Sequence, residues 1–147
     1  MTTQNIAQRL ENIYQGEPWF GESLQTKLES VSTEKAYAQP VNNRHSIAEI
    51  LSHMEFWRKS FIEQLKGNDA SAYSGDSPEN WPSVENLKKL GWEKQKELFR
   101  ETQQDLVKLL RTSKSVNEDL INNLNGLVDH DIYHIGQIGI VKSLVNK

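Results

Sequence analysis

Apolar residues recur with a period near 3.6 along several long segments of this chain, and no alternating strand pattern of any length competes with them. The pattern predicts four long helices, the first of which breaks near Gly16. At 147 residues the chain is long enough for one buried core, so a single domain over residues 1–147 is expected. Four long helices in one domain predict an all-α four-helix bundle. The helices are expected over residues 3–31, 47–65, 84–112 and 117–145.

Capping signals and a glycine refine these helix boundaries. Ser46–Glu49 has the form of a capping box and predicts the start of the second helix, and Ser115–Glu118 is a second such pattern before the fourth. Gly91 is expected to divide a short entry piece from the main third helix. The inner face of that third helix is expected to include Leu90.

Two segments between the most regular stretches contain aromatic residues. Residues 67–83 are rich in Gly, Ser, Asp, Asn and Pro, which indicates a long surface loop. Tyr73 and Trp81 are expected to attach this loop to the body of the protein. Trp19 and Phe20 begin an apolar series at helical spacing and are expected to belong to a helix that starts at Trp19.

The composition is that of an ordinary folded protein, with 36% hydrophobic residues, 25% charged residues and a net charge of −3. The acidic balance and the lack of clustered Lys and Arg argue against a nucleic-acid surface. No apolar run approaches the roughly 18 residues of a membrane span, and the N-terminal residues lack the pattern of a secretory signal. We therefore expect a cytoplasmic protein with no membrane or nucleic-acid partner.

Three histidines form the candidate functional site. His130 and His134 are four residues apart on a predicted helix, so their rings project from the same face and can converge on one metal ion. His53 lies on the edge of the apolar stripe of another predicted helix. Facing helices of a bundle are a usual place for a metal site, and three ligands leave a coordination position open for water or substrate.

The alternative is that each histidine is a core or boundary residue whose ring is satisfied by a hydrogen bond, because histidine is often found at intermediate burial. The chain has no cysteine, so any metal must be held by nitrogen and oxygen donors. Three histidines on two inward faces favour the metal site over this alternative.

Five residues near the histidines each allow two interpretations. Asp131 could accept a hydrogen bond from a ligand ring and fix its tautomer, or form an ion pair on the surface or between helices. Gln137 could orient a ligand or substrate, or bond to the backbone. Trp57 could be a core residue or a pocket wall. Glu49 is better explained by its capping box than by chemistry, and His45 precedes the helix and is excluded as a ligand.

The sequence resembles the DinB-like superfamily over nearly its whole length. The run His130–Ile138 closely resembles the signature of the fourth helix of that family, and Ser46–Trp57 resembles the signature of its second helix. A weaker similarity covers Gly16–Trp19. The resemblance implies an up-down-down-up four-helix bundle, often dimeric, with a divalent metal bound by three histidines. By motif, these histidines correspond to His53, His130 and His134.

The resemblance also implies an activity, because members of the family include transferases that use bacillithiol, mycothiol or glutathione. A set of three neutral nitrogen ligands suits zinc or nickel, with a water or a thiolate at the open position. Because the chain lacks cysteine, any thiol must be an external low-molecular-weight co-substrate. We therefore expect a thiol S-transferase or a hydrolase that acts on a small molecule. We also expect the bundle to form a homodimer. The alternative is a non-catalytic, stress-related dimeric bundle whose metal is structural or absent.

Overall fold

The computed structural model describes residues 1–146. Within this part of the chain every regular element is helical and no strand occurs, as the apolar period predicts. The four long helices are α1 (Thr3–Gln15), α4 (Ile47–Leu65), α6 (Trp92–Thr112) and α7 (Glu118–Val145). The short elements are the helices α2 (Leu24–Glu29), α3 (Thr33–Tyr37) and α5 (Val84–Leu90) and the 3-10 turn η1 (Pro78–Asn80).

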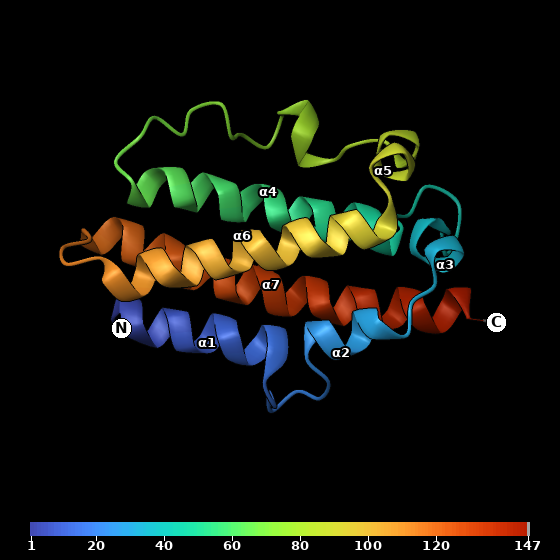
Figure 1. The fold of residues 1–147 in the computed structure, drawn as a ribbon, viewed down its shortest axis with the longest axis horizontal. Helices are drawn as coiled ribbons and strands as arrows, with labels where there is room; N and C mark the ends of the chain where they lie inside the picture. Colours follow the sequence, from blue (N-terminus) through green and yellow to red (C-terminus); the bar gives the residue numbers. More distant parts are fainter. Residues whose placement is uncertain (147) are drawn as a thin grey trace.

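The long helices lie side by side around a shared apolar core (Figure 1). In this view α1 and α7 run from left to right along the chain, and α4 and α6 run in the opposite direction. Helices α1 and α4 each contact both α6 and α7, and α2 continues along the side of α1 and also contacts α7. No helix among residues 1–146 has the length and apolarity that crossing a membrane requires.

Three of the long helices, α1, α4 and α7, begin at side-chain caps. At the start of α4 the Ser46 hydroxyl accepts from the Glu49 amide at 3.2 Å, and the Glu49 carboxylate accepts from the Ser46 amide at 3.0 Å. This capping box is the predicted one. The box predicted at Ser115 is wrong, because Asn117 is the cap of α7 and accepts from the Leu120 amide at 2.8 Å. Asn is at least as good an N-cap as Ser, and here it lies directly before the helix.

The helix predicted to start at Trp19 begins only after Ser23. Gly21 has a φ of 131°, which a helix does not permit, and the Ser23 hydroxyl caps α2 by accepting from the Thr26 amide at 3.3 Å. Trp19 is fully exposed, with a relative accessibility of 104%, and Phe20 is exposed as well. The prediction that this aromatic pair belongs to the helix and faces the core is therefore wrong.

Gly91 separates α5 from α6, as predicted from the sequence. Its φ of 94° and ψ of 142° are a conformation that favours glycine, and they change the direction of the chain between the two helices. Leu87 of α5 is buried, and its carbonyl accepts a 3.3 Å hydrogen bond from the Tyr37 hydroxyl. Leu90 is instead 41% exposed, so its predicted place on the inner face is wrong, because α5 does not continue the axis of α6.

Candidate metal site

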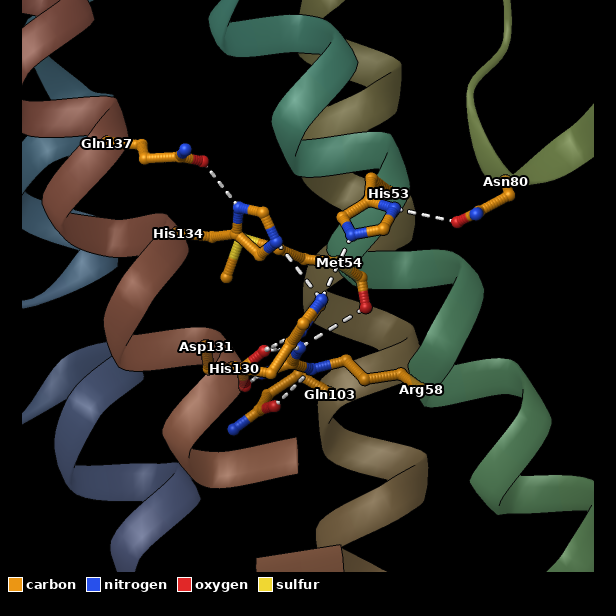
Figure 2. Close-up of polar contacts among 9 residues, drawn as sticks. All are labelled: His53, Met54, Arg58, Asn80, Gln103, His130, Asp131, His134 and Gln137. Carbon is orange, nitrogen blue, oxygen red and sulfur yellow. Dashed lines mark hydrogen bonds and ion pairs between the residues drawn. The ribbon is translucent and has the colours of Figure 1, made fainter. Parts of the chain in front are cut away.

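Three histidine side chains from two helices meet between α4 and α7 (Figure 2). His53 comes from the middle of α4, and His130 and His134 come from successive turns of α7. The Nε2 atom of His130 lies 3.0 Å from Nε2 of His53 and 3.0 Å from Nε2 of His134. One ligand atom of each ring lies within 4.8 Å of those of the other two. The structure thus brings together the three histidines singled out in the sequence.

The three rings differ in their exposure to solvent. His53 and His134 are buried, with relative accessibilities of 7% and 6%, whereas the side chain of His130 is 29% exposed. Contact between α4 and α7 places the rings at this depth, since each histidine lies beside the apolar stripe of its own helix. Access from solvent is therefore through the side of the cluster that His130 occupies.

In two of the rings Nδ1, the outer nitrogen that faces away from the centre of the cluster, forms a hydrogen bond with a side-chain amide. Nδ1 of His53 lies 2.7 Å from Oδ1 of Asn80, and Nδ1 of His134 lies 2.6 Å from Oε1 of Gln137. A second bond sets the first amide, because Asn80 Nδ2 donates to the Gly75 carbonyl at 3.2 Å. Since an amide oxygen only accepts, each Nδ1 carries the hydrogen, and each neutral ring presents the lone pair of Nε2 to the centre of the cluster.

His130 faces both of these lone pairs and completes the donor set. A single hydrogen on its Nε2 would have to serve His53 and His134 together, whereas a cation can interact with all three lone pairs. Its buried Nδ1 has no hydrogen-bond partner among residues 1–146 and lies 3.9 Å from Oδ1 of Asp131. With a cation at the centre, Nδ1 of His130 would carry a hydrogen directed near that carboxylate. The residues present therefore fit a metal ion.

Asp131 forms a buried ion pair between helices, which is one of the two interpretations that the sequence allows. Arg58 of α4 donates to both carboxylate oxygens of Asp131, at 3.0 and 2.5 Å, and both side chains are almost fully buried. The Arg58 guanidinium also donates to Oε1 of Gln103 on α6 at 2.8 Å and lies 4.6 Å from the centre of the Phe99 ring. This network joins α4, α6 and α7 directly beneath the histidine cluster (Figure 2).

The loop before α5 covers one side of the site through Trp81. Its ring stacks between two histidines, 4.0 Å from His53 and 3.8 Å from His45, with interplanar angles of 8° and 9°. His45 lies outside the three-histidine cluster and bonds to the Glu49 carboxylate at 3.0 Å. Trp81 therefore attaches the loop to the body as predicted, and Tyr73 does so too, 5.1 Å from the ring of Phe56.

Trp57 has both of the roles that were considered for it. The side chain packs against the core at partial burial, and it also lines an open groove of about 370 Å³ between α4 and α7. His130 lines the same groove, so Trp57 belongs to the wall of a cavity that adjoins the histidine cluster.

Burial keeps two of the rings neutral. It lowers the pKa of His53 from 6.5 to about 4, an effect that the hydrogen bond to Asn80 opposes and the nearby His134 and His130 reinforce. Burial also lowers the pKa of His134, against the hydrogen bond with Gln137. At neutral pH these rings therefore offer unprotonated nitrogens without first having to lose a proton.

The metal-free protein is expected to lose stability as the pH falls from about 7 to about 4. In the unfolded chain His53 takes up a proton near pH 6.5, whereas in the folded protein it does so only near 4. The unfolded state therefore binds more protons over this range, and the free energy of unfolding should fall by on the order of 3 kcal/mol. Chemical denaturation in EDTA at several pH values measures the slope. The variant His53→Gln lacks this titrating group and should show a shallower slope, of which the part due to His134 remains. An equally steep slope in the variant would contradict the assignment.

Several residues at the site were not found from the sequence. Asn80 lies in the loop with no periodic pattern to indicate that it reaches His53. Arg58 carried a usable signal, because it lies four residues after Met54 on the buried stripe of α4, where a charged group needs a partner. Gln103, which accepts from Arg58, is buried on the inner face of α6.

Comparisons with known proteins give one positive result. Residues 21–138 match the DinB superfamily, and this span contains all three histidines and most of the chain. A search of curated proteins finds no match, and a search of solved structures finds none. The family match and the all-helical fold agree with the resemblance seen in the sequence. This chain belongs to the DinB superfamily.

Proposed function

We propose that this protein is a metal-dependent enzyme whose divalent ion is bound by Nε2 of His53, His130 and His134. The observation that carries the proposal is the convergence of the three Nε2 atoms, with that of His130 lying 3.0 Å from each of the other two. Zinc–nitrogen bonds of about 2.0–2.1 Å separate two ligands of a tetrahedral ion by roughly 3.3 Å, which is close to this spacing. Three protein ligands with an open position are typical of catalytic rather than structural zinc sites.

Zinc and nickel are the proposed ions, because both accept imidazole nitrogen and the site offers no thiolate. When bound, the ion would act as a Lewis acid that lowers the pKa of water or of a small thiol at the open position. Its chemistry suits transfer of an external thiol of the bacillithiol type, or hydrolysis. Membership of the DinB superfamily supports the transferase, and the lack of cysteine requires that the thiol be a co-substrate.

The side chains around the ligands hold them in the tautomer that a metal needs. Asn80 and Gln137 accept from the outer nitrogens of His53 and His134, which directs both lone pairs inward. Trp81 covers one face of the His53 ring and excludes water from that side. The cluster is therefore organised before an ion arrives, which reduces the cost of ordering the ligands on binding.

We also propose that the four long helices form an up-down-down-up bundle within one domain. The opposite directions of α1 and α7 against α4 and α6 support this topology (Figure 1). A homodimer is proposed from the similarity to the superfamily. The apolar residues Tyr133, Ile140 and Leu144 are exposed on α7 and provide surface that such a contact could bury.

Metal analysis of the purified protein tests the metal site, with one zinc or nickel ion per chain as the expected result. Failure to bind either ion stoichiometrically after supplementation would overturn the proposal. Conjugation of bacillithiol, mycothiol and glutathione to an electrophile, and hydrolysis of simple esters and amides, should then be measured with and without EDTA. If the chelator lowers thermal stability and no reaction is found, the non-catalytic bundle is favoured instead.

The Asn80→Ala variant is expected to bind zinc about 10- to 100-fold more weakly than the wild type, because loss of an outer hydrogen-bond partner frees the ligand ring. Nδ1 of His53 and the Gly75 carbonyl lose their partner, and all three ligands remain. Competition with a chromogenic chelator measures the affinity. Asn68→Ala is the matched control, since Asn68 lies in the same loop and bonds to Glu63 at the surface. Equal zinc affinity in the two variants would show that Asn80 does not position His53.

A further inference from the structure

An open groove of about 370 Å³ lies between α4 and α7 and adjoins the histidine cluster. On both helices its lining residues recur at positions i, i+3, i+4 and i+7, so one continuous face of each helix forms a wall. Of the three histidines, His130 is the one that lines it. The other lining residues are Trp57, Ser60, Phe61 and Gln64 of α4 and Asn123, Gly126 and Leu127 of α7.

The chemistry of these walls is apolar and uncharged. Trp57, Phe61 and Leu127 supply aromatic and aliphatic surface, while the polar groups other than the His130 ring are neutral amides and a hydroxyl. Among the described residues that line the groove there is no Asp, Glu, Lys or Arg. A charged ligand group bound against these walls would lose water without gaining a countercharge from a side chain, whereas an apolar group would gain by burial.

The groove is also placed where a reacting molecule must lie. His130 has the most exposed ring of the cluster, and its Nε2 is 3.0 Å from Nε2 of each of the other two rings. On the far side of His53 the approach is covered by Trp81. A molecule in the groove is therefore adjacent to the donor set through His130. The volume lies within the range of about 300–1,000 Å³ that is usual for small-molecule sites.

We propose that this groove binds the uncharged aromatic or aliphatic part of the substrate, stacked against Trp57 and Phe61 with its reactive end at His130. The inference rests on the proposed metal-dependent function and names the substrate class for it. For a thiol transferase this group belongs to the electrophile, because the carboxylates of a thiol co-substrate would find no Lys or Arg side chain in the groove. Gln64, whose Nε2 donates to the Ser60 hydroxyl at 3.2 Å, and Asn123 contribute neutral amides to the same walls.

A larger side chain at Gly126 would fill the groove without changing a proposed metal ligand. It lies one turn before His130 on α7, and an added Cβ would meet no atom within 4 Å. Side chains on a helix lean toward its N-terminus, so a leucine at this position would extend away from His130. Leucine also favours helix over glycine, so Gly126→Leu should fold at least as well as the wild type. Gly136→Leu is the matched control, because Gly136 is equally open on α7 and does not line the groove.

The probe is N-phenyl-1-naphthylamine, a neutral fluorescent molecule, compared with 8-anilinonaphthalene-1-sulfonate, which has the same ring system and an added sulfonate. Zinc-loaded wild type is expected to bind the neutral probe more tightly than the anionic one. Gly126→Leu should weaken binding of the neutral probe by roughly tenfold or more, and Gly136→Leu should leave it unchanged. In the cobalt-loaded protein, paramagnetic broadening of the proton signals of the bound probe should place it beside the metal.

Zinc content measured in the same samples separates the two proposals. Stoichiometric zinc in all three proteins, with neutral-probe binding lost only in Gly126→Leu, supports the substrate groove. Equal probe binding in Gly126→Leu and wild type would overturn it, as would tighter binding of the sulfonate or the absence of paramagnetic broadening. Failure of the wild type to take up either zinc or nickel would overturn the proposed function, whatever the probe results.

Discussion

Replacing His134 by alanine is expected to abolish stoichiometric metal binding while the helical fold remains. Two of the three Nε2 donors would be left, and the ring that Gln137 now orients would be gone. Loss of a direct ligand should cost more than the 10- to 100-fold in affinity that is typical for loss of an outer partner, an effect of roughly three orders of magnitude or more. Metal analysis after dialysis, together with circular dichroism, measures both parts of the prediction.

His45→Ala is the matched control for this variant. His45 is a fourth histidine near the site, stacked on Trp81 and bonded to Glu49, but it lies outside the cluster of three. The control protein is expected to retain one ion per chain. If His134→Ala also kept its ion, or if His45→Ala lost it, the assignment of the ligands would be wrong.

Replacing Arg58 by methionine is expected to lower the free energy of unfolding by about 3–5 kcal/mol, because one charge of a buried pair would lose its partner. Asp131 is fully buried and accepts from Arg58 through both carboxylate oxygens. The variant would also leave Oε1 of Gln103 without its donor. Urea denaturation, monitored by circular dichroism, measures the change.

Two further proteins separate the uncompensated charge from the loss of packing. Arg111→Met breaks a partly exposed pair with Glu11 and should cost only about 0–1 kcal/mol. The double variant Arg58→Met/Asp131→Leu removes both buried charges and should recover most of the stability that the single variant loses. A small effect in Arg58→Met, or no recovery in the double variant, would contradict the account of a buried ion pair that requires both members.

The sequence was sufficient to predict the parts of the fold that depend on periodicity and local capping. Long apolar stripes specify α1, α4, α6 and α7 because a helix that buries one face repeats every 3.6 residues. The same geometry relates His130 to His134, since the two residues share a helix. The place of His53 could also be predicted, because its position on the stripe of α4 directs it toward a packed neighbour.

What could not be predicted depends on contacts between segments that are distant in sequence. Asn80 reaches His53 from a loop whose path no local pattern specifies, and Arg58 reaches Asp131 only after two helices pack. Errors at element ends have local causes: Gly21 adopts a positive φ that leaves Trp19 in solvent, and Asn117 is a competing cap two residues beyond the expected one.

His53, a proposed metal ligand, is also a residue on which the loop before α5 docks, because Trp81 of that loop stacks on its ring. Asn80 and Trp81, two consecutive residues of that loop, contact respectively the outer nitrogen and the face of the ring. The coupling free energy between two binding events is reciprocal. If the docked loop strengthens metal binding by a given free energy, the bound metal strengthens docking of the loop by the same free energy. Loading the site would therefore tighten the attachment of a surface segment that itself donates no ligand.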